Sequence, residues 1–218
     1  MKALKTALIA GSSGLVGSQL LSDLLADQSI ERVIILVRSP LDIRNNRLQQ
    51  VVTDFERLDT IAEWFKGVDA VFCCLGTTIK KAKSKEAFKK VDYEFPLALA
   101  TLSEQNNVNH FLCITAMGAD VASGIFYNKV KGEVERDISK KKIPCITFFR
   151  PSLLIGNRKE SRPGERIGIF IARILGFLFI GPLKNYKGIR IEKVAKAMHA
   201  EAQDPQPGLR IVLSGSMQ

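Results

Sequence analysis

The sequence is poor in residues that bind metals or form disulfides. Its 218 residues include two histidines and four cysteines. His110 and His199 lie near no second ligand residue at a useful spacing, and the cysteines sit in apolar runs such as AVFCCLG that match no zinc pattern. We therefore predict no metal site, and we expect buried, reduced thiols in a cytoplasmic protein.

Long apolar runs are also missing. The longest, at 167–183, is shorter than the roughly 20 residues that span a bilayer, and it carries Arg173 in its middle. The N-terminal run MKALKTALIA leads into a glycine turn rather than a cleavage site, which favours a first strand. We predict no transmembrane segment. The 167–183 stretch is expected to close over a substrate or to form a homodimer contact.

Acidic residues are fewer than basic ones. The formal net charge is +10 and the pI is about 9.6, which is compatible with nucleic acid, a membrane surface or a phosphorylated cofactor as an anionic partner. Lysine clusters at 80–90, 140–142 and 184–196 lack interleaved aromatics and any known nucleic-acid motif. We interpret them as solvated faces and predict no specific nucleic-acid partner.

Repeats, low-complexity tracts and Gly/Ser linkers are absent, whereas short apolar runs are frequent. TALIAG, RVIILVR, LQQVVTD, DAVFCCLG, HFLCITA and CITFFRP predict strands, and helical periodicity fills the gaps between them. Nearly uninterrupted apolar strands indicate a sheet covered on both faces. We predict an α/β protein with a Rossmann-type doubly wound parallel sheet in three layers. Residues 1–218 would form one domain, with 157–190 as a small C-terminal, substrate-side cap.

A glycine turn, GSSGLVG at 11–17, joins the first predicted strand to the first helix. Gly11 and Gly14 would let the backbone turn sharply near a phosphate at the helix N-terminus, and Gly17 would let the helix pack on the strand. An ordinary strand-to-helix turn would give the same pattern, because the spacing is GxxGxxG rather than GxGxxG.

The second predicted strand ends in Arg38, where an NAD-preferring site would place an acidic residue. A guanidinium can bind a 2′-phosphate, so Arg38 favours NADPH/NADP over NAD, although a solvated arginine is the alternative. Asp54 follows the third strand, near the expected adenine. Gly76 follows the fourth strand and would leave room for the cofactor.

Tyr127 and Lys131 are four residues apart, so they would share one face of a helix. A phenol needs a nearby cation to exchange a proton at neutral pH, and Lys131 would supply it. A solvated helix face is the alternative, because lysines are frequent in this chain.

Together these motifs resemble the short-chain dehydrogenase/reductases, specifically the atypical branch typified by the HIV Tat-interactive protein 2 oxidoreductases. The resemblance spans nearly the whole chain and includes GSSGLVG, CCLGTT, GAD, YNKVKGEVE, FRPSLL and NRKESRPGE. It implies an NADPH-binding Rossmann fold, with Arg38 on the adenosine phosphate and Tyr127 and Lys131 as the catalytic pair that also holds the nicotinamide ribose. The other implied cofactor contacts are Ser13, Gly14, Leu15, Val16, Leu75, Gly76, Leu154 and Arg162.

One position departs from the family pattern. Two hydroxyl residues are usual at the end of the fifth strand, but this chain has Thr115 followed by Ala116. Strand alternation turns only one of these side chains to the cleft, so Thr115 is the candidate for holding a substrate oxygen. We predict an NADPH-dependent oxidoreductase for an unidentified small-molecule carbonyl or alcohol. A non-catalytic NADP(H)-binding redox sensor, and more weakly a nucleic-acid-associated protein, are the alternatives.

Overall fold

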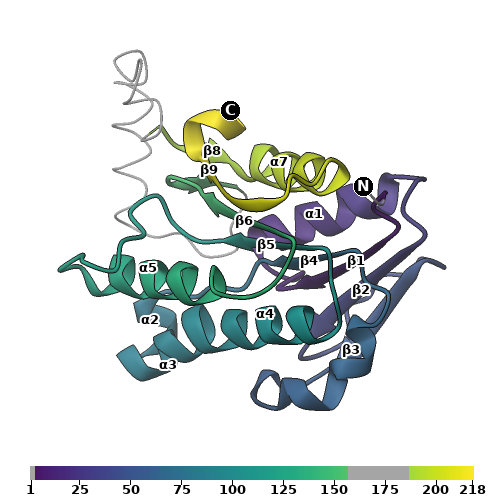
Figure 1. Cartoon of the computed structure of the whole chain (residues 1–218), viewed down its shortest axis with the longest axis horizontal. Helices are drawn as coiled ribbons and strands as arrows, with labels where there is room; N and C mark the ends of the chain where they lie inside the picture. Colours follow the sequence, from purple (N-terminus) through teal and green to yellow (C-terminus); the bar gives the residue numbers. More distant parts are fainter. Residues whose placement is uncertain (1–2, 157–186) are drawn as a thin grey trace.

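A wholly parallel seven-stranded sheet forms the centre of the molecule in the computed structural model, which describes residues 3–156 and 187–218 (Figure 1). Its strands in chain order are β1 (Thr6–Ala10), β2 (Arg32–Val37), β3 (Leu48–Val52), β4 (Ala70–Cys73), β5 (His110–Ile114), β6 (Cys145–Arg150) and β9 (Gly208–Leu213). A separate pair, β7 (Leu154–Ile155) and β8 (Ile189–Arg190), forms a second small parallel sheet.

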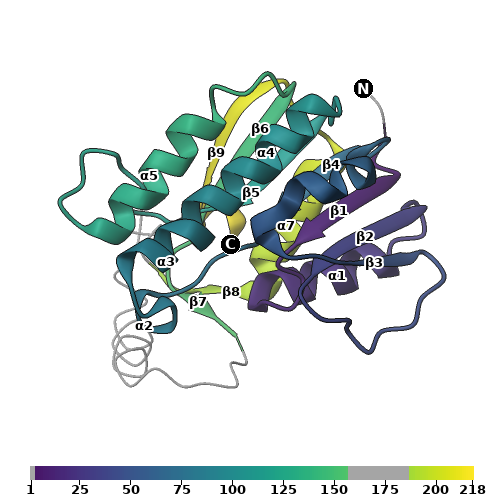
Figure 2. The ribbon, with the colours of Figure 1, turned by 90° about the horizontal axis from the view of Figure 1, so that it is seen from below.

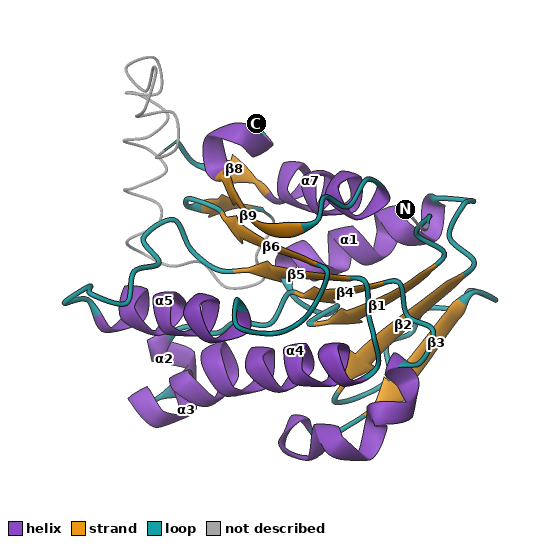
Figure 3. Ribbon diagram, viewed as in Figure 1, coloured by secondary structure: helices purple, strands orange, loops and turns teal. Residues whose placement is uncertain are grey.

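Helices cover both faces of the large sheet, giving three layers (Figure 3). One face carries α1 (Leu15–Ala26) and α7 (Ile191–Gln203), and the other carries η1 (Phe55–Phe65), α4 (Phe95–Gln105) and α5 (Phe126–Ile138). The short elements α2 (Ile79–Ala82), α3 (Lys85–Lys89) and the π-helical turn η2 (Lys90–Glu94) lead into α4, and η5 (Ser214–Met217) ends the chain. Each face holds its own apolar cluster.

The sheet order places the site. The strands run β3-β2-β1-β4-β5-β6-β9, so the chain reverses direction across the sheet between β1 and β4. In open parallel sheets, ligands bind beyond the carboxyl ends of the strands at such a reversal. The loops after β1 and β4 meet at this point, because Cys74 N–H donates a hydrogen bond to the Ala10 carbonyl (2.8 Å).

The predicted fold class is confirmed. All six predicted strands are present as β1 to β6. Five of them are buried, nearly continuous apolar runs that leave few alternatives, whereas the edge strand β3 has one buried residue in five. The strand β9 was missed, because it lies at the sheet edge and most of its residues are exposed. Residues 157–186, which hold most of the predicted cap, the 167–183 stretch and Arg162, lie outside the described residues, so the single-domain division, the cap and the homodimer contact stay predictions.

Three further findings concern membrane-spanning helices, the cysteines and His110. No helix in the described part of the chain has the length and apolarity required to cross a membrane. All four cysteines are free thiols, and three of them are buried. His110 is the first residue of β5 and is buried, with Nε2 2.9 Å from Thr147 Oγ1.

Candidate cofactor and catalytic site

The turn between β1 and α1 is built from close backbone contacts that only glycine permits. Gly11 has a φ of +90°, and a Cβ atom there would lie 2.6 Å from the Cys74 carbonyl oxygen. A Cβ at Gly17 would lie 2.2 Å from the Gly11 oxygen, so α1 packs directly on the turn. Gly14 N–H donates to that same oxygen at 3.0 Å. Gly11 and Gly17 therefore fix the close packing of this turn.

The turn also has the properties that a phosphate group needs. Gly14 is exposed and precedes α1, and no side chain caps this helix. Within the described residues, the buried Ser12 hydroxyl has no hydrogen-bond partner. An uncapped helix start next to an unsatisfied hydroxyl fits an anionic group that accepts hydrogen bonds. The residues present are thus compatible with a dinucleotide pyrophosphate.

A surface hollow of about 450 Å³ adjoins the turn. It is lined by Ser13 and by residues 37–41 at the end of β2, including Arg38. Arg38 is exposed, and none of the lining residues in the described part of the chain is acidic. The structure therefore brings Arg38 and Ser13 together, as the expected adenosine end of the site requires. Val16 and Gly17 are buried in α1, so they shape the turn from behind.

The strongest electrostatic feature is an ion pair that is almost wholly buried. Lys131 Nζ, on α5, lies 2.7 Å from Asp92 Oδ1, on η2, with side-chain exposures of 5% and 1%. Burial lowers the pKa of Lys131, but the negative charge of Asp92, with a smaller contribution from Tyr127, outweighs this and raises the pKa above its ordinary value. Lys131 is therefore a fixed cation inside the protein.

The loop after β4 lies over this pair. Thr77 N–H donates to Asp92 Oδ2 at 2.8 Å. A Cβ on the exposed Gly76 would lie 3.5 Å from Asp92 Oδ1 and 4.0 Å from Lys131 Nζ, so the glycine leaves the pair with only a thin cover. Leu75 precedes it and is half-buried. The residues expected beside the dinucleotide and the expected catalytic lysine thus meet at one place.

Tyr127 lies one turn before Lys131 on α5 and is half-buried. Its ring packs against that of Phe88 on α3, with centroids 5.6 Å apart. Among the described residues, no hydrogen bond holds its hydroxyl. The predicted helical pairing of Tyr127 and Lys131 is therefore present, with the lysine fixed and the phenol hydroxyl unengaged.

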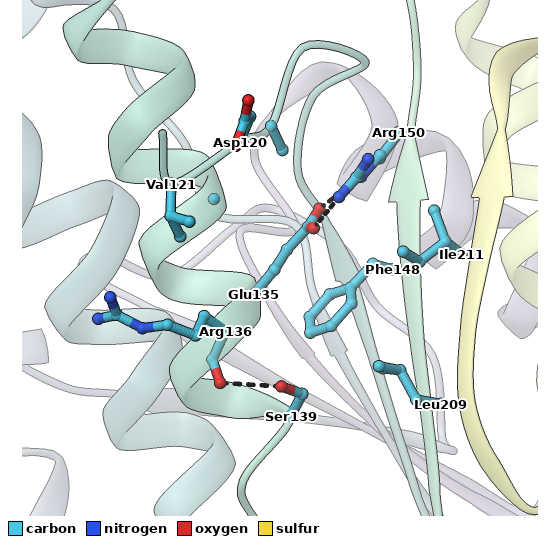
Figure 4. Close-up of a pocket in the computed structure, with 11 residues that line it drawn as sticks. Asp120, Val121, Glu135, Arg136, Ser139, Phe148, Arg150, Leu209 and Ile211 are labelled. Carbon is cyan, nitrogen blue, oxygen red and sulfur yellow. Dashed lines mark hydrogen bonds and ion pairs between the residues drawn. The ribbon is translucent and has the colours of Figure 1, made fainter. Parts of the chain in front are cut away.

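Thr115 is placed differently from the expectation. Its hydroxyl donates to Glu135 Oε1 at 2.5 Å and lies 3.3 Å from the Phe149 carbonyl oxygen. Glu135 comes from α5 and also binds Arg150 at the end of β6, and these two side chains point toward each other beside a cavity of about 300 Å³ (Figure 4). Phe148, Leu209 and Ile211 line that cavity too. Thr115 therefore fastens β5 to α5 and β6.

Two other predicted contacts have local structural roles. Asp54 is exposed, and its carboxylate accepts a hydrogen bond from Glu56 N–H at the start of η1. Leu154 lies in β7, where it pairs with Ile189. Sequence reasoning missed two of the buried carboxylates, Asp92 and Glu135. Glu135 lies four residues after Lys131, a spacing that could have placed it on the same side of the helix, whereas no local pattern marks Asp92.

Comparison with known proteins decides the family. The model of a family described as NAD(P)H-binding matches residues 11–156. The chain belongs to this NAD(P)H-binding family. It is an atypical short-chain dehydrogenase/reductase, and it is 39% identical over 164 residues to rat Protein HTATIP2, covering 74% of this chain and 67% of the rat protein.

Two other similarities bear on location and fold. Mitochondrial Protein FMP52 of Debaryomyces hansenii is 35% identical over 158 residues, covering 72% of this chain and 70% of that protein. Relatives in other fungi are also named mitochondrial, so the expected cytoplasmic location is wrong. UDP-glucose 4-epimerase of Thermotoga maritima, at 14% identity, superposes with a TM-score of 0.71 over 96% of this chain and 77% of the epimerase, which shows the shared fold.

Proposed function

We propose that this family member is an NADP(H)-dependent oxidoreductase that reduces a carbonyl or oxidises an alcohol. The observation that carries the proposal is the buried cation of Lys131, held by Asp92 one helical turn from the unengaged Tyr127 hydroxyl. The Lys131 ammonium lies under Gly76, and Gly76 belongs to the loop after β4, which contacts the glycine turn. The glycine turn and the helix turn that carries Tyr127 and Lys131 therefore lie at the same end of the sheet.

The chain's own part of this reaction is proton transfer at the Tyr127 hydroxyl. The nicotinamide, when bound, would supply the hydride chemistry. The Lys131 ammonium, one helical turn away, would stabilise negative charge that develops on the phenol oxygen as the proton moves. Ser13, Gly14, Leu15 and Val16 would hold the pyrophosphate, and Lys131 the nicotinamide ribose. Thr115 is left out of the catalytic set, because its proton is already donated to Glu135.

The preference for NADP(H) rests on Arg38 in the hollow beside Ser13. A forked, charge-assisted hydrogen bond to a 2′-phosphate contributes about 1.5 to 3 kcal/mol. We expect Arg38→Ala to weaken NADPH binding about tenfold to a hundredfold and to leave NADH binding nearly unchanged in fluorescence titrations. Arg44→Ala, at another exposed arginine, is the control. Equal affinity of the unaltered protein for NADH and NADPH would remove this part of the proposal.

Catalysis is tested by a screen of carbonyl compounds for NADPH oxidation. Tyr127→Phe should lower turnover by about a hundredfold to ten-thousandfold with NADPH affinity retained, because general acid catalysis is of that size. Tyr93→Phe is the matched control, since its hydroxyl binds Asp137 (3.0 Å) rather than the site. Full turnover in Tyr127→Phe would exclude the proton-donor role.

A redox sensor that binds NADP(H) without turnover is the second candidate. It is favoured by the engagement of Thr115 with Glu135 and by Ala116, which together leave no hydroxyl from the end of β5 for a substrate oxygen. The same screen separates the two functions. The sensor is supported if the unaltered protein binds NADPH but oxidises it with none of the carbonyl compounds.

A further inference from the structure

One end of the molecule carries an unusually dense group of lysines. Six lysines and one glutamate lie between residues 80 and 90, on α2, α3 and the start of η2. Two of the lysines have acidic partners: Lys89 is 3.9 Å from Glu133 and Lys90 is 2.7 Å from Glu56. Lys80, Lys83 and Lys85 are exposed and form no ion pair with any described residue. Their charge is therefore open to an external anion.

Exposed apolar side chains accompany these lysines. Ile79 begins α2 and is 44% exposed, and Ile125, which immediately precedes α5, is 63% exposed. The exposed Lys129 lies four residues after Ile125, so both belong to one side of the first turn of α5. This end of the molecule therefore offers both positive charge and aliphatic surface to a partner.

These residues come from elements that lie together at one end of the molecule, and we call the set the basic end face. The ring of Phe88 on α3 packs against that of Phe126 on α5, with centroids 5.7 Å apart, and Lys85 Nζ lies 5.4 Å from the Phe126 centroid. Figure 2 shows α2, α3 and the start of α5 together at one end of the molecule. The basic end face comprises Ile79, Lys80, Lys83, Lys85, Ile125 and Lys129.

The chemistry of this face distinguishes among anionic partners. None of its described residues is an arginine, the residue that binds phosphates and bases through a planar fork. The neighbouring rings of Phe88 and Phe126 pack on each other instead of standing free to stack on bases. Lysines attract an anionic surface as flexible point charges, and aliphatic side chains between them can enter an apolar layer. A lipid surface supplies both chemistries.

We propose that the basic end face docks on the surface of an anionic lipid bilayer. Lys80, Lys83, Lys85 and Lys129 attract the head groups, while Ile79 and Ile125 enter the interface. The face lies at the carboxyl end of the sheet, since α2 and α3 follow β4 and α5 follows β5. Docking would therefore set the end that carries Gly76 and Tyr127 toward the bilayer. The docking itself does not depend on catalysis or on cofactor choice.

The test is co-sedimentation of the full chain with vesicles of phosphatidylcholine alone and of phosphatidylcholine mixed with phosphatidylglycerol. We expect binding to the mixed vesicles only, and weaker binding as salt is raised. The variant K80E/K83E should lower the partition coefficient at least about 25-fold, since each lysine near an anionic surface contributes about fivefold. Ile125→Ser should weaken binding further with little change in its salt dependence.

The control is K193E/K196E, which makes the same charge change at the same spacing on the exposed side of α7. Equal losses in the two double variants would overturn the proposal, because net charge alone would explain the binding. Equal binding to both vesicle types would also overturn it. Binding of a DNA duplex that K80E/K83E abolishes, without vesicle binding, would assign the face to nucleic acid instead. Thermal unfolding of each variant confirms that it is folded.

Discussion

The buried pair of Lys131 and Asp92 predicts that removing one charge is costly. Asp92→Asn keeps the size of the side chain, and its amide oxygen can still accept the hydrogen bond from Thr77 N–H. What the change removes is the negative charge 2.7 Å from the Lys131 ammonium. A buried cation left without its partner typically destabilises a protein by about 3 to 5 kcal/mol.

Release of a proton from Lys131 sets an upper bound to one part of this loss, the penalty of leaving its ammonium buried and unpaired. Without Asp92, burial dominates and lowers the pKa of Lys131, so the ammonium can release its proton instead of remaining buried and charged. If the pKa falls below 7, the loss at pH 7 reaches about 4.6 kcal/mol, from roughly 3.4 pKa units below the ordinary 10.4 at 1.36 kcal/mol each. At pH 9 the same arithmetic limits the loss to about 2 kcal/mol.

The sign of the pH dependence follows. In the unaltered protein the folded-state pKa of Lys131 is raised, so the stability from this group is complete below about 10.4 and is lost only as the pH rises through the folded-state pKa. In Asp92→Asn the folded-state pKa is depressed, so the unfolded chain binds more protons and stability increases with pH. The difference between the two proteins should therefore shrink from pH 7 to pH 9.

Urea unfolding monitored by circular dichroism at both pH values measures the effect. Asp137→Asn is the matched control, since Asp137 pairs with Arg136 and Lys140, which are 51% and 67% exposed, and should lose at most about 1 kcal/mol. The double variant D92N/K131M should recover most of the loss, because neither charge remains buried. A loss below about 1 kcal/mol in Asp92→Asn at pH 7 would refute the reasoning.

Two more predictions concern packing and titration. Gly17→Ala should lower the free energy of unfolding in urea by about 1 to 3 kcal/mol and weaken NADPH binding, because its Cβ would meet the Gly11 oxygen. Gly124→Ala is the control: nothing lies within 4 Å of its Cβ, so the free energy of unfolding should change by less than about 0.5 kcal/mol. Burial lowers the pKa of His110 to about 4, so the native protein should lose up to about 3 kcal/mol as the pH falls from 6.5 toward 4. His110→Gln should flatten this pH dependence; an unchanged slope would contradict it.

The fold was largely accessible from the sequence. Strands such as β2, with five of six residues buried, leave an apolar signature that few other structures share. The edge strand β9 lacks that signature, because Leu209 and Ile211 stay 53% and 45% exposed. β9 is held at the edge of the sheet by pairing with β6, about 60 positions earlier in the chain, and no local sequence pattern indicates such a contact. Burial on both faces makes a strand easier to recognise but is not required, since the edge strand β3, with one buried residue in five, was also predicted.

The candidate site was predictable where one short segment creates it. The glycine turn is such a case, since steric contacts within residues 11–17 and with Cys74 demand glycine. Tyr127 and Lys131 share a helix, so their spacing alone places them together. The partner of Lys131 was not predictable, because Asp92 comes from a π-helical turn 39 positions earlier in the chain. Whether a lysine has an acidic partner thus depends on the tertiary structure and not on its neighbours in the sequence.

Thr115 shows how this limit affects the chemistry. Alternation along β5 predicted that one of Thr115 and Ala116 faces the cleft, but it could not decide what else competes for the hydroxyl. The buried carboxylate of Glu135 accepts hydrogen bonds from both Thr115 and Arg150. A buried carboxylate that lost a donor would be left partly unsatisfied, so this arrangement resists releasing Thr115 to a substrate. The buried charge that holds the scaffold together thereby leaves Tyr127 as the proton donor of the proposed site.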